Sequence, residues 1–180
     1  MSRWSDFYKD RVKNDLYESY FDQRYSLVAD MIVNSSKDKV IHEIGCGIGS
    51  LYKSIKRKSD KDIHYVLSDI DDEMVKLSKD NTGNKPIILR MDCLNSCSNA
   101  DVVVSHGLLE HLSDDQINKI VDSRSYLAKT QIHYVPGYKY EKPSFGDERL
   151  LKKDEWNKIC RPSDIIEFND GYDYILIFKK

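Results

Sequence analysis

Glycine occupies alternate positions in one short segment of the chain. Residues 43–49, with the sequence EIGCGIG, place Gly45, Gly47 and Gly49 between an apolar run and a helical pattern. Glycine permits positive φ angles and lets a ligand approach the main chain with no Cβ in the way. A helix that begins there offers free N–H groups and partial positive charge to an anionic group. The spacing therefore indicates a ligand-binding turn, although a tight turn without a ligand would use the same residues.

A carboxylate follows at the distance that a nucleoside site requires. Asp69 ends the second apolar run, about 20 residues after the last glycine, where α/β nucleoside sites place a group that accepts hydrogen bonds from ribose hydroxyls. The dinucleotide pattern G-x-G-x-x-G would require glycine where the chain has Ser50. The Tyr-x-x-x-Lys pair typical of short-chain dehydrogenases occurs as Tyr138 and Lys142, but in a loop rather than on a helix. These features favour a nucleoside cofactor other than NAD.

Short β-rich runs alternate with helical patterns along the chain. The expected parallel strands are residues 40–44, 64–69, 86–90, 101–105 and 131–135. Continuous apolar runs such as 102–104 suit strands that helices cover on both faces, as in parallel sheets. Near the C-terminus, Asn169-Asp170-Gly171 lies between two alternating runs and predicts an antiparallel hairpin. The predicted fold class is therefore α/β, with a mostly parallel sheet.

The N-terminal residues 1–36 carry no strand pattern. Apolar side chains recur there at helical spacing, which predicts one or two helices that cap a core formed by residues 37–180. These apolar side chains include Leu16, Tyr20, Leu27 and Met31. A chain of 180 residues, 40% of them hydrophobic, supports one core, so we expect a single domain over residues 1–180. The irregular stretch 136–150 is long for a loop, which is typical of functional loops.

Composition limits the classes of partner. A net charge of −2 gives no general attraction to nucleic acid or to anionic membranes. No apolar run approaches the roughly 20 residues of a membrane span, and the N-terminus lacks a signal-peptide pattern, so we expect a cytoplasmic protein with no membrane partner. The 4 cysteines form no C-x-x-C pair and are interpreted as reduced thiols, not as disulfides or zinc ligands.

Four segments in order resemble the motifs of the class I S-adenosyl-L-methionine-dependent methyltransferases. They are HEIGCGIG, LSDIDDEM, RMDCLN and DVVVSHGLLEHL. The resemblance implies a Rossmann-like doubly wound sheet of about seven strands, with a C-terminal antiparallel hairpin and N-terminal cap helices. It also implies S-adenosyl-L-methionine as cofactor and S-adenosyl-L-homocysteine as product. One departure is that SYLAKT replaces the Pro-Gly-Gly turn that usually precedes the fifth strand.

The same resemblance implies a set of cofactor-binding residues. The set is Glu43, Gly45, Cys46, Gly47, Asp69, Ile70, Asp92, Cys93 and Ser105. The residues of the glycine turn would line the methionine part of the cofactor, Asp69 would hold the ribose and Ile70 would flank the adenine. The pair from the third motif would meet the amino edge of the adenine. The serine of the fourth motif would close the pocket together with His106.

Methyl transfer from a sulfonium mainly requires alignment and a dry site. An oxygen acceptor still needs a general base, and a protonated amine must lose a proton before it attacks. His106 follows the fourth strand and is the candidate base; the alternative is that it only shapes the cofactor pocket. Tyr138, in the loop after the fifth strand, is predicted to face the acceptor. His106 and Tyr138 are thus the predicted catalytic residues.

The fourth motif and a basic run bear on the acceptor. Glu110-His111 resembles part of the metal-binding Glu-x-x-Glu-His of small-RNA 2′-O-methyltransferases, but Gly107 replaces the first glutamate, so we expect no metal. The basic run 53–61 is expected to be a solvated helix end. The Asn/Asp-Pro-Pro-Tyr signature of base-amine methylation is absent. We therefore expect a small-molecule acceptor and no nucleic acid, with no oligomeric state predicted; the alternatives are an RNA methyltransferase and a catalytically silent S-adenosylmethionine-binding or regulatory domain.

Overall fold

One mixed sheet forms the centre of the molecule. The computed structural model describes residues 4–36, 39–59, 63–88 and 100–179. Within these ranges the sheet has 7 strands in the order β3-β2-β1-β4-β5-β7-β6. The strands are β1 (Val40–Ile44), β2 (His64–Asp69), β3 (Ile87–Ile88), β4 (Val102–His106), β5 (Thr130–Pro136), β6 (Asp164–Phe168) and β7 (Asp173–Lys179). Neighbouring strands in the row β3, β2, β1, β4, β5 run parallel to one another, while β7 pairs antiparallel with both β5 and β6. The predicted α/β class and C-terminal hairpin are confirmed.

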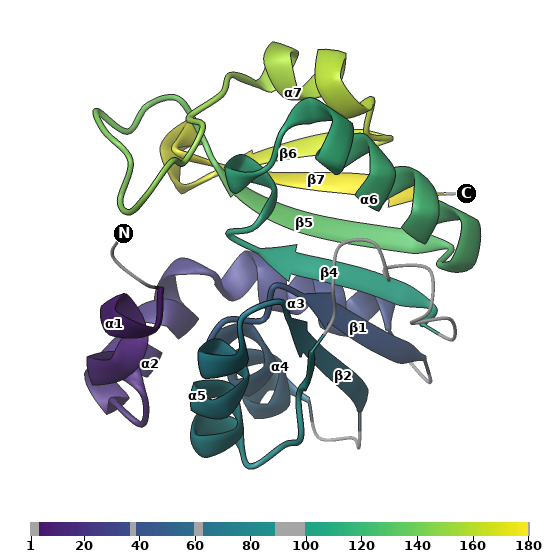
Figure 1. The fold of residues 1–180 in the computed structure, drawn as a ribbon. Coiled ribbons are helices and arrows are strands. Elements are labelled where there is room, and N and C mark those ends of the chain that lie inside the picture. The colour runs from purple at the N-terminus through teal and green to yellow at the C-terminus, as the bar shows by residue number, and fades with distance from the viewer. Residues whose placement is uncertain (1–3, 37–38, 60–62, 89–99, 180) are drawn as a thin grey trace.

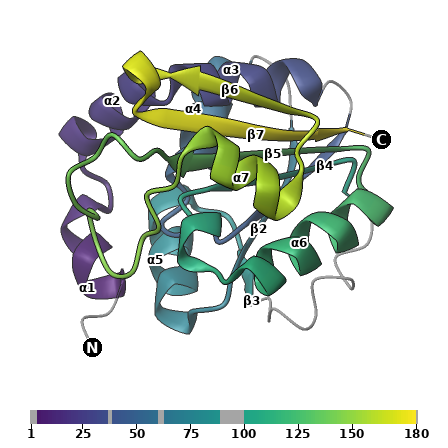
Figure 2. The same ribbon diagram turned by 90° about the horizontal axis from the view of Figure 1, so that it is seen from above.

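Helices cover both faces of this sheet (Figures 1 and 2). The helices are α1 (Trp4–Tyr8), α2 (Asp15–Arg24), α3 (Ser26–Ser35), α4 (Ser50–Lys58), α5 (Asp72–Thr82), α6 (Asp114–Leu127) and α7 (Lys153–Cys160). Helices α2 to α4 pack on one face, and α6 and α7 pack on the other. In the part of the chain that is described, no helix is long and apolar enough to cross a membrane. The arrangement is that of a Rossmann-like doubly wound fold.

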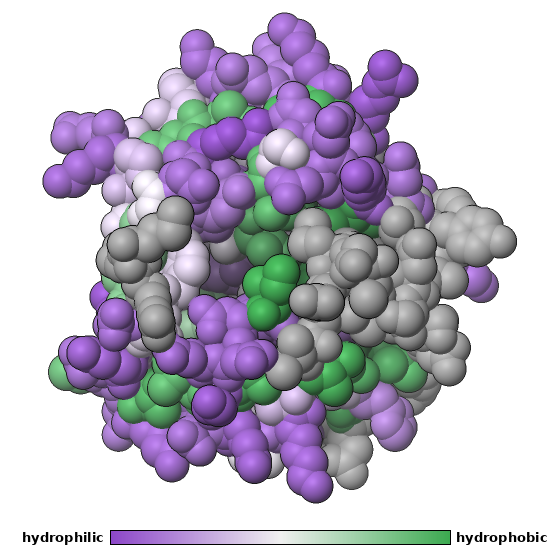
Figure 3. Space-filling model, viewed as in Figure 1, coloured by the Kyte–Doolittle hydropathy of each residue, from purple (hydrophilic) through white to green (hydrophobic). Residues whose placement is uncertain are grey.

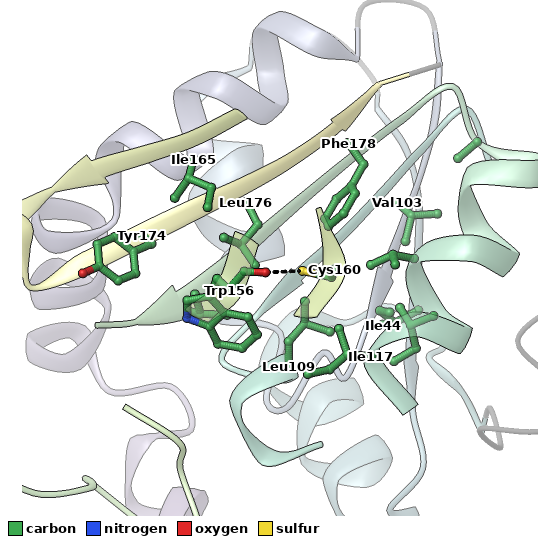
Figure 4. Packing of buried hydrophobic residues seen from close by; sticks show 14 of the residues in the cluster. Ile44, Val103, Leu109, Ile117, Trp156, Cys160, Ile165, Tyr174, Leu176 and Phe178 are labelled. Atoms are coloured by element: carbon green, nitrogen blue, oxygen red, sulfur yellow. Dashed lines mark hydrogen bonds between the residues drawn. The ribbon is translucent and has the colours of Figure 1, made fainter. Parts of the chain in front are cut away.

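The apolar runs of the central strands supply two cores. Val102 and Val104 of β4 pack with α3 and α4, whereas Val103 packs with α6 and α7. Successive side chains of a strand point to opposite faces, so a continuous apolar run serves both cores. Figure 4 shows the second of these cores, in which fully buried Trp156 of α7 lies among side chains of α6 and β7. The covered sheet explains why the strands lack an alternating pattern.

The N-terminal helices bury only part of the apolar set that recurs at helical spacing. Leu16, Tyr20 and Leu27 are 85%, 54% and 40% exposed, respectively. The buried side chains are Phe21, Val28, Ala29 and Ile32. No single helical periodicity runs through both α2 and α3, because the helix breaks between them at Tyr25, which has φ −109° and ψ 19°. The described residues form three α-helices here, α1, α2 and α3, where the sequence predicts one or two, and Met31 packs against the core as its position in the pattern suggests.

The sequence predicts a solvated helix end for the basic run of α4, but side chains of this run form ion pairs with the N-terminal helices. Lys53 and Arg57 both bind Glu18 of α2, and Arg57 also binds Asp22 at 2.7 Å. Lys58 binds Asp30 of α3 at 2.7 Å. These ion pairs hold the cap helices against α4, because the N-terminal helices present an acidic surface to it. Partly exposed pairs of this kind contribute about 0.2–1 kcal/mol each.

Candidate functional site

The glycine segment forms the turn between β1 and α4. Gly45, Gly47 and Gly49 have φ angles of 64°, 54° and 77°, a region that L side chains rarely adopt. A Cβ on Gly49 would lie 2.4 Å from Cγ2 of Thr82, so this glycine also permits close packing against α5. A Cβ on Gly47 would have only Met74 nearby, at 3.5 Å. Gly47 therefore leaves its bare main chain open to the cavity beside it.

Asp69 lies at the end of β2 against this turn. The main-chain nitrogen of Gly47 donates to Oδ2 of Asp69 at 2.9 Å, and that of Asp71 donates to Oδ1 at 3.1 Å. Burial raises the pKa of Asp69 from its usual range, while these main-chain N–H groups act in the opposite direction. Each carboxylate oxygen keeps a lone pair for a further donor. The pair of Gly47 and Asp69 thus offers main-chain and carboxylate groups to a single ligand.

A first cavity of about 330 Å³ lies over the turn at the carboxyl ends of β1, β2 and β4. The predicted residues that line it are Glu43, Gly45, Cys46, Gly47, Asp69, Ile70 and His106. Ser105 is fully buried and does not line it, because its hydroxyl group forms a hydrogen bond of 2.8 Å with Nδ1 of His133. The predicted residues Asp92 and Cys93 lie outside the described residues. Of the predicted site residues that the structure describes, most therefore lie together around this cavity.

Two ionisable groups of this cavity are held in their neutral form. Burial raises the pKa of Glu43 to about 8, although Tyr65 donates to its Oε2 at 2.8 Å. Burial likewise raises the pKa of the Cys46 thiol well above its usual value. A thiol with a raised pKa is a weak nucleophile. Both side chains therefore act as walls of the cavity.

A second cavity of about 270 Å³ adjoins the first. Aromatic side chains dominate its lining: Trp4, Phe7, Tyr8, Tyr20, Tyr25, Tyr134 and Tyr140. Trp4, Tyr8, His106, Gly107 and His111 line both cavities, so the two meet there. Helix α1 and the 137–151 loop lie at the same end of the molecule in Figures 1 and 2, and the rings of Trp4 and Phe145 are 4.4 Å apart. Figure 3 shows a hollow near the centre of the viewed face.

His106 ends β4 between the two cavities. Its ring stacks on Tyr134 at 4.3 Å and meets the edge of Tyr25 at 4.2 Å. Burial lowers the pKa of His106 to about 3, so the ring is neutral near pH 7. Its Nε2 has no hydrogen-bond partner among the described residues. A neutral, buried imidazole with a pKa of about 3 is a weak base near pH 7, but it can orient a polar group through a hydrogen bond.

Tyr138 does not join the site. Its side chain is 46% exposed, it lines neither cavity, and Nζ of Lys152 lies 5.5 Å from its ring centroid. Tyr134 and Tyr140 line the second cavity instead. Tyr134 could have been found from strand pairing, since it lies opposite His106 in the parallel register of β4 and β5. The path of the loop that brings in Tyr140 leaves no periodic signal.

A buried aspartate fixes one wall of the second cavity. Asp173 is fully buried and accepts hydrogen bonds from Arg24 at 2.7 Å, Tyr134 at 2.9 Å and Tyr140 at 2.8 Å. These partners come from α2, β5 and the 137–151 loop. A buried charge requires such partners. Asp173 therefore joins the cap helices and the loop to the sheet, a role that the sequence pattern did not reveal.

One group of side chains in the described ranges has the spacing of a metal site. Atoms of Glu110, His111 and Glu148 that could bind a metal lie within 4.8 Å of one another. His111 Nδ1 also lies 3.2 Å from Oδ1 of Asp147. Clusters of this composition are common in proteins without a metal. The expected absence of a metal stays a prediction.

Fold and site together define a class of α/β protein that binds a nucleoside cofactor at the carboxyl edge of its sheet. A family model for the methyltransferase domain matches residues 42–137, more than half of the chain. The chain belongs to this family and is a class I S-adenosylmethionine-dependent methyltransferase with S-adenosyl-L-methionine as cofactor. No curated protein sequence matches the chain.

Solved structures of methyltransferases share the fold. An S-adenosylmethionine-dependent methyltransferase from Clostridium acetobutylicum ATCC 824 is 14% identical with a TM-score of 0.65, over 92% of this chain and 98% of that one. Magnesium protoporphyrin IX methyltransferase from Synechocystis PCC 6803, with bound S-adenosylhomocysteine, is 19% identical with a TM-score of 0.60, over 87% and 81%. Small RNA methyltransferase HEN1 is 16% identical with a TM-score of 0.68, but the chain spans 25% of its length.

Proposed function

We propose that the chain transfers a methyl group to a small molecule bound in the second cavity. The observation that carries this proposal is the wall that the two cavities share, which includes His106, whose buried Nε2 has no hydrogen-bond partner among the described residues. The second cavity has a volume of about 270 Å³ and walls of both aromatic and polar side chains, which suit a small, partly apolar ligand. Because the cavities share this wall, a ligand in one cavity can meet a ligand in the other without solvent between them.

The first cavity fits the cofactor by its donor set. Gly47 offers a bare main chain, and Asp69 offers carboxylate oxygens that suit the two ribose hydroxyls. Ile70, which is 61% exposed, offers an apolar surface for the adenine. When bound, S-adenosylmethionine supplies an electrophilic methyl group. The residues of the chain align that group with the second cavity and exclude water.

His106 is the residue that orients the acceptor. Its neutral ring is held between Tyr25 and Tyr134, so Nε2 keeps one orientation. From there it orients the acceptor through a hydrogen bond, because a ring with a pKa of about 3 is a weak base near pH 7. Tyr140 takes the place predicted for Tyr138, because its side chain lines the second cavity.

Label transfer from methyl-labelled S-adenosylmethionine tests the proposal. The purified chain is incubated separately with fractionated metabolite extract and with total RNA. We expect label in a metabolite fraction, with release of S-adenosylhomocysteine, and none with His106→Ala. Label in RNA alone, which falls steeply between about 50 and 200 mM salt, would indicate an RNA substrate, because phosphate contacts release counterions. Cofactor binding with no transfer to any fraction would support the catalytically silent alternative.

A further inference from the structure

The carboxyl group of Glu110 is buried where the two cavities meet. Glu110 is 2% exposed, and its Oε2 has no hydrogen-bond partner among the described residues. Its Oε1 lies 3.5 Å from the position that a Cβ on Gly107 would take. Gly107 lines both cavities and Glu110 lines the second, so the carboxyl group lies beside their junction. Buried polar atoms are almost always paired, so an unpaired carboxyl oxygen at a cavity indicates a missing donor.

A second unpaired acceptor lies at the same junction. His106 lines both cavities, and its buried Nε2 has no hydrogen-bond partner among the described residues. In the neutral tautomer that carries its proton on Nδ1, Nε2 has a lone pair and accepts a hydrogen bond. Nε2 of His106 and Oε2 of Glu110 therefore both lack a donor. A ligand that satisfied both would need at least two donated hydrogens.

A second carboxyl group and several aromatic rings line the cavity beside these two groups. Glu148 lines the second cavity, and one of its oxygens lies within 4.8 Å of ligating atoms of Glu110 and His111. Trp4, Phe7 and Tyr8 line the same cavity. Aromatic faces attract cations, most strongly where water is excluded. Two cationic side chains, Arg24 and Lys142, also line the cavity, and the guanidinium of Arg24 is bound 2.7 Å from Asp173.

We propose that the junction of the cavities binds an amine, held by Glu110 and His106, and that the atom methylated is its nitrogen. This inference rests on the proposed function and narrows its acceptor class. A primary ammonium has three donors and no acceptor, so it can pair with both side chains at once. A hydroxyl group has a single donor and would leave one of them unpaired. The positive charge of the ammonium also complements Glu110 and Glu148.

The protons balance with the residues at the junction. A neighbouring ammonium favours the ionised form of Glu110, because a cation stabilises the charged form of a carboxyl group. The ammonium then gives one proton to this carboxylate, whose pKa burial raises to about 8, and the nitrogen lone pair is freed. That lone pair forms the new N–C bond while the electron pair of the C–S bond returns to sulfur, giving S-adenosylhomocysteine and the methylated ammonium. Glu110 then releases its proton to water, and His106 orients the nitrogen through a hydrogen bond.

Paired acceptors test this proposal directly. A panel of primary and secondary amines is compared with alcohols of the same carbon skeleton, such as 2-phenylethylamine and 2-phenylethanol. Two quantities are measured: methyl transfer, and the shift of the thermal midpoint in the presence of S-adenosylhomocysteine. We expect amines to be favoured at least about tenfold over their alcohols, because an alcohol leaves a buried acceptor unpaired.

A pair of variants separates the carboxyl group from general effects of charge. Glu110→Gln keeps the size of the side chain and should weaken amine binding about 10- to 100-fold while leaving S-adenosylhomocysteine affinity unchanged. Glu141→Gln is the matched control, since Glu141 is exposed on the 137–151 loop and lines neither cavity. It should change neither quantity. Equal amine binding by wild type and Glu110→Gln overturns the proposal.

Other results identify what the junction binds instead. Transfer to alcohols, phenols or thiols but to no amine overturns the amine inference and leaves the proposed function intact. Transfer to RNA alone overturns both. If a chelator abolishes transfer and Mn²⁺ restores it in the wild type but not in Glu110→Gln, the carboxylates hold a metal and the amine inference is wrong. If no amine shifts the thermal midpoint or accepts a methyl group, the inference also fails.

Discussion

The main-chain nitrogen of Gly47 donates a hydrogen bond of 2.9 Å to Oδ2 of Asp69. This contact joins the two features that the sequence separates by more than 20 residues, the glycine turn after β1 and the carboxylate at the end of β2. It holds the carboxylate at the mouth of the first cavity, which both residues line. The free lone pairs of Asp69 are therefore fixed in place before the cofactor arrives, which lowers the entropy lost on binding.

Replacement of Asp69 by Ala should weaken S-adenosylmethionine binding by roughly 1–3 kcal/mol, because the ribose hydroxyls lose their acceptor. Isothermal titration calorimetry measures the change. Asp80→Ala is the control, since Asp80 is exposed on α5 and lines neither cavity. NADH should not bind to the wild type. Unchanged cofactor affinity in Asp69→Ala would remove Asp69 from the cofactor site.

Gly47→Val should abolish cofactor binding while the far-UV circular dichroism stays that of a folded chain. Its side chain would enter the cavity, where only Met74 lies within 4 Å of the new Cβ. The strained φ angle of 54° adds a cost of its own. Gly83→Val controls for that strain, because Gly83 has φ 73° and open space around it. If both variants bind the cofactor normally, the glycines serve only the turn.

Buried carboxyl groups should make the stability of the chain fall between pH 6.5 and 8.5. Glu43 and Glu110 have folded pKa values of about 8, above the value of 4.5 for the unfolded chain. Their contribution is therefore fully present below pH 4.5 and is lost as the pH rises through about 8. His106 acts oppositely, because its pKa falls from 6.5 to about 3, so its contribution is lost only as the pH falls below 6.5.

Above pH 6.5 the two glutamates thus act without opposition from His106. Each should lower the free energy of unfolding by roughly 1–2 kcal/mol across this window. Chemical denaturation of the cofactor-free chain at a series of pH values measures the slope. Glu43→Gln and Glu110→Gln should each flatten it, and Glu141→Gln should not. If the slope is the same in the wild type and in all three variants, the raised pKa values are not those of Glu43 and Glu110.

Strand positions and the cofactor turn were predictable from the sequence, because each depends on local chemistry. The apolar run at residues 40–44 coincides with β1, and the glycines that follow it have the positive φ angles for which glycine is suited. Asp69 was predictable too, since a parallel sheet places the carboxyl ends of β1 and β2 side by side. In these elements the pattern of a few neighbouring residues determines the structure.

The second cavity was not predictable in the same way. Glu110, Glu148 and Tyr140 reach it through a turn after β4 and an irregular loop, whose paths depend on tertiary contacts. For example, the main-chain nitrogen of Arg149 donates to the main-chain oxygen of Glu110 at 2.9 Å, and this bond holds the loop beside the turn that follows β4. No periodicity in the loop marks such a contact. Tyr138 illustrates the result, because it lies in that loop but lines neither cavity.

Disruption of the Asp173 network should destabilise the chain and impair acceptor binding. Asp173→Ala leaves Arg24 without its carboxylate and the hydroxyl groups of Tyr134 and Tyr140 without their acceptor. Removing one member of a buried charged pair costs about 3–5 kcal/mol; since Arg24 is 25% exposed, we expect about 2–3 kcal/mol here. Urea denaturation measures the loss. A change below about 0.5 kcal/mol would show that the network is not structural.

The tyrosines of the 137–151 loop separate acceptor chemistry from cofactor binding. Tyr140→Phe removes a hydroxyl group that donates to Asp173 at 2.8 Å and lies on the wall of the second cavity, so kcat/KM for the acceptor should fall about tenfold. Tyr138→Phe is its matched partner on the same loop and should leave kcat/KM unchanged, because Tyr138 lines neither cavity. S-adenosylmethionine affinity should be unaltered in both, since neither residue lines the first cavity. A loss of turnover in Tyr138→Phe but not in Tyr140→Phe would restore the role first predicted for Tyr138 and contradict the acceptor site described by the structure.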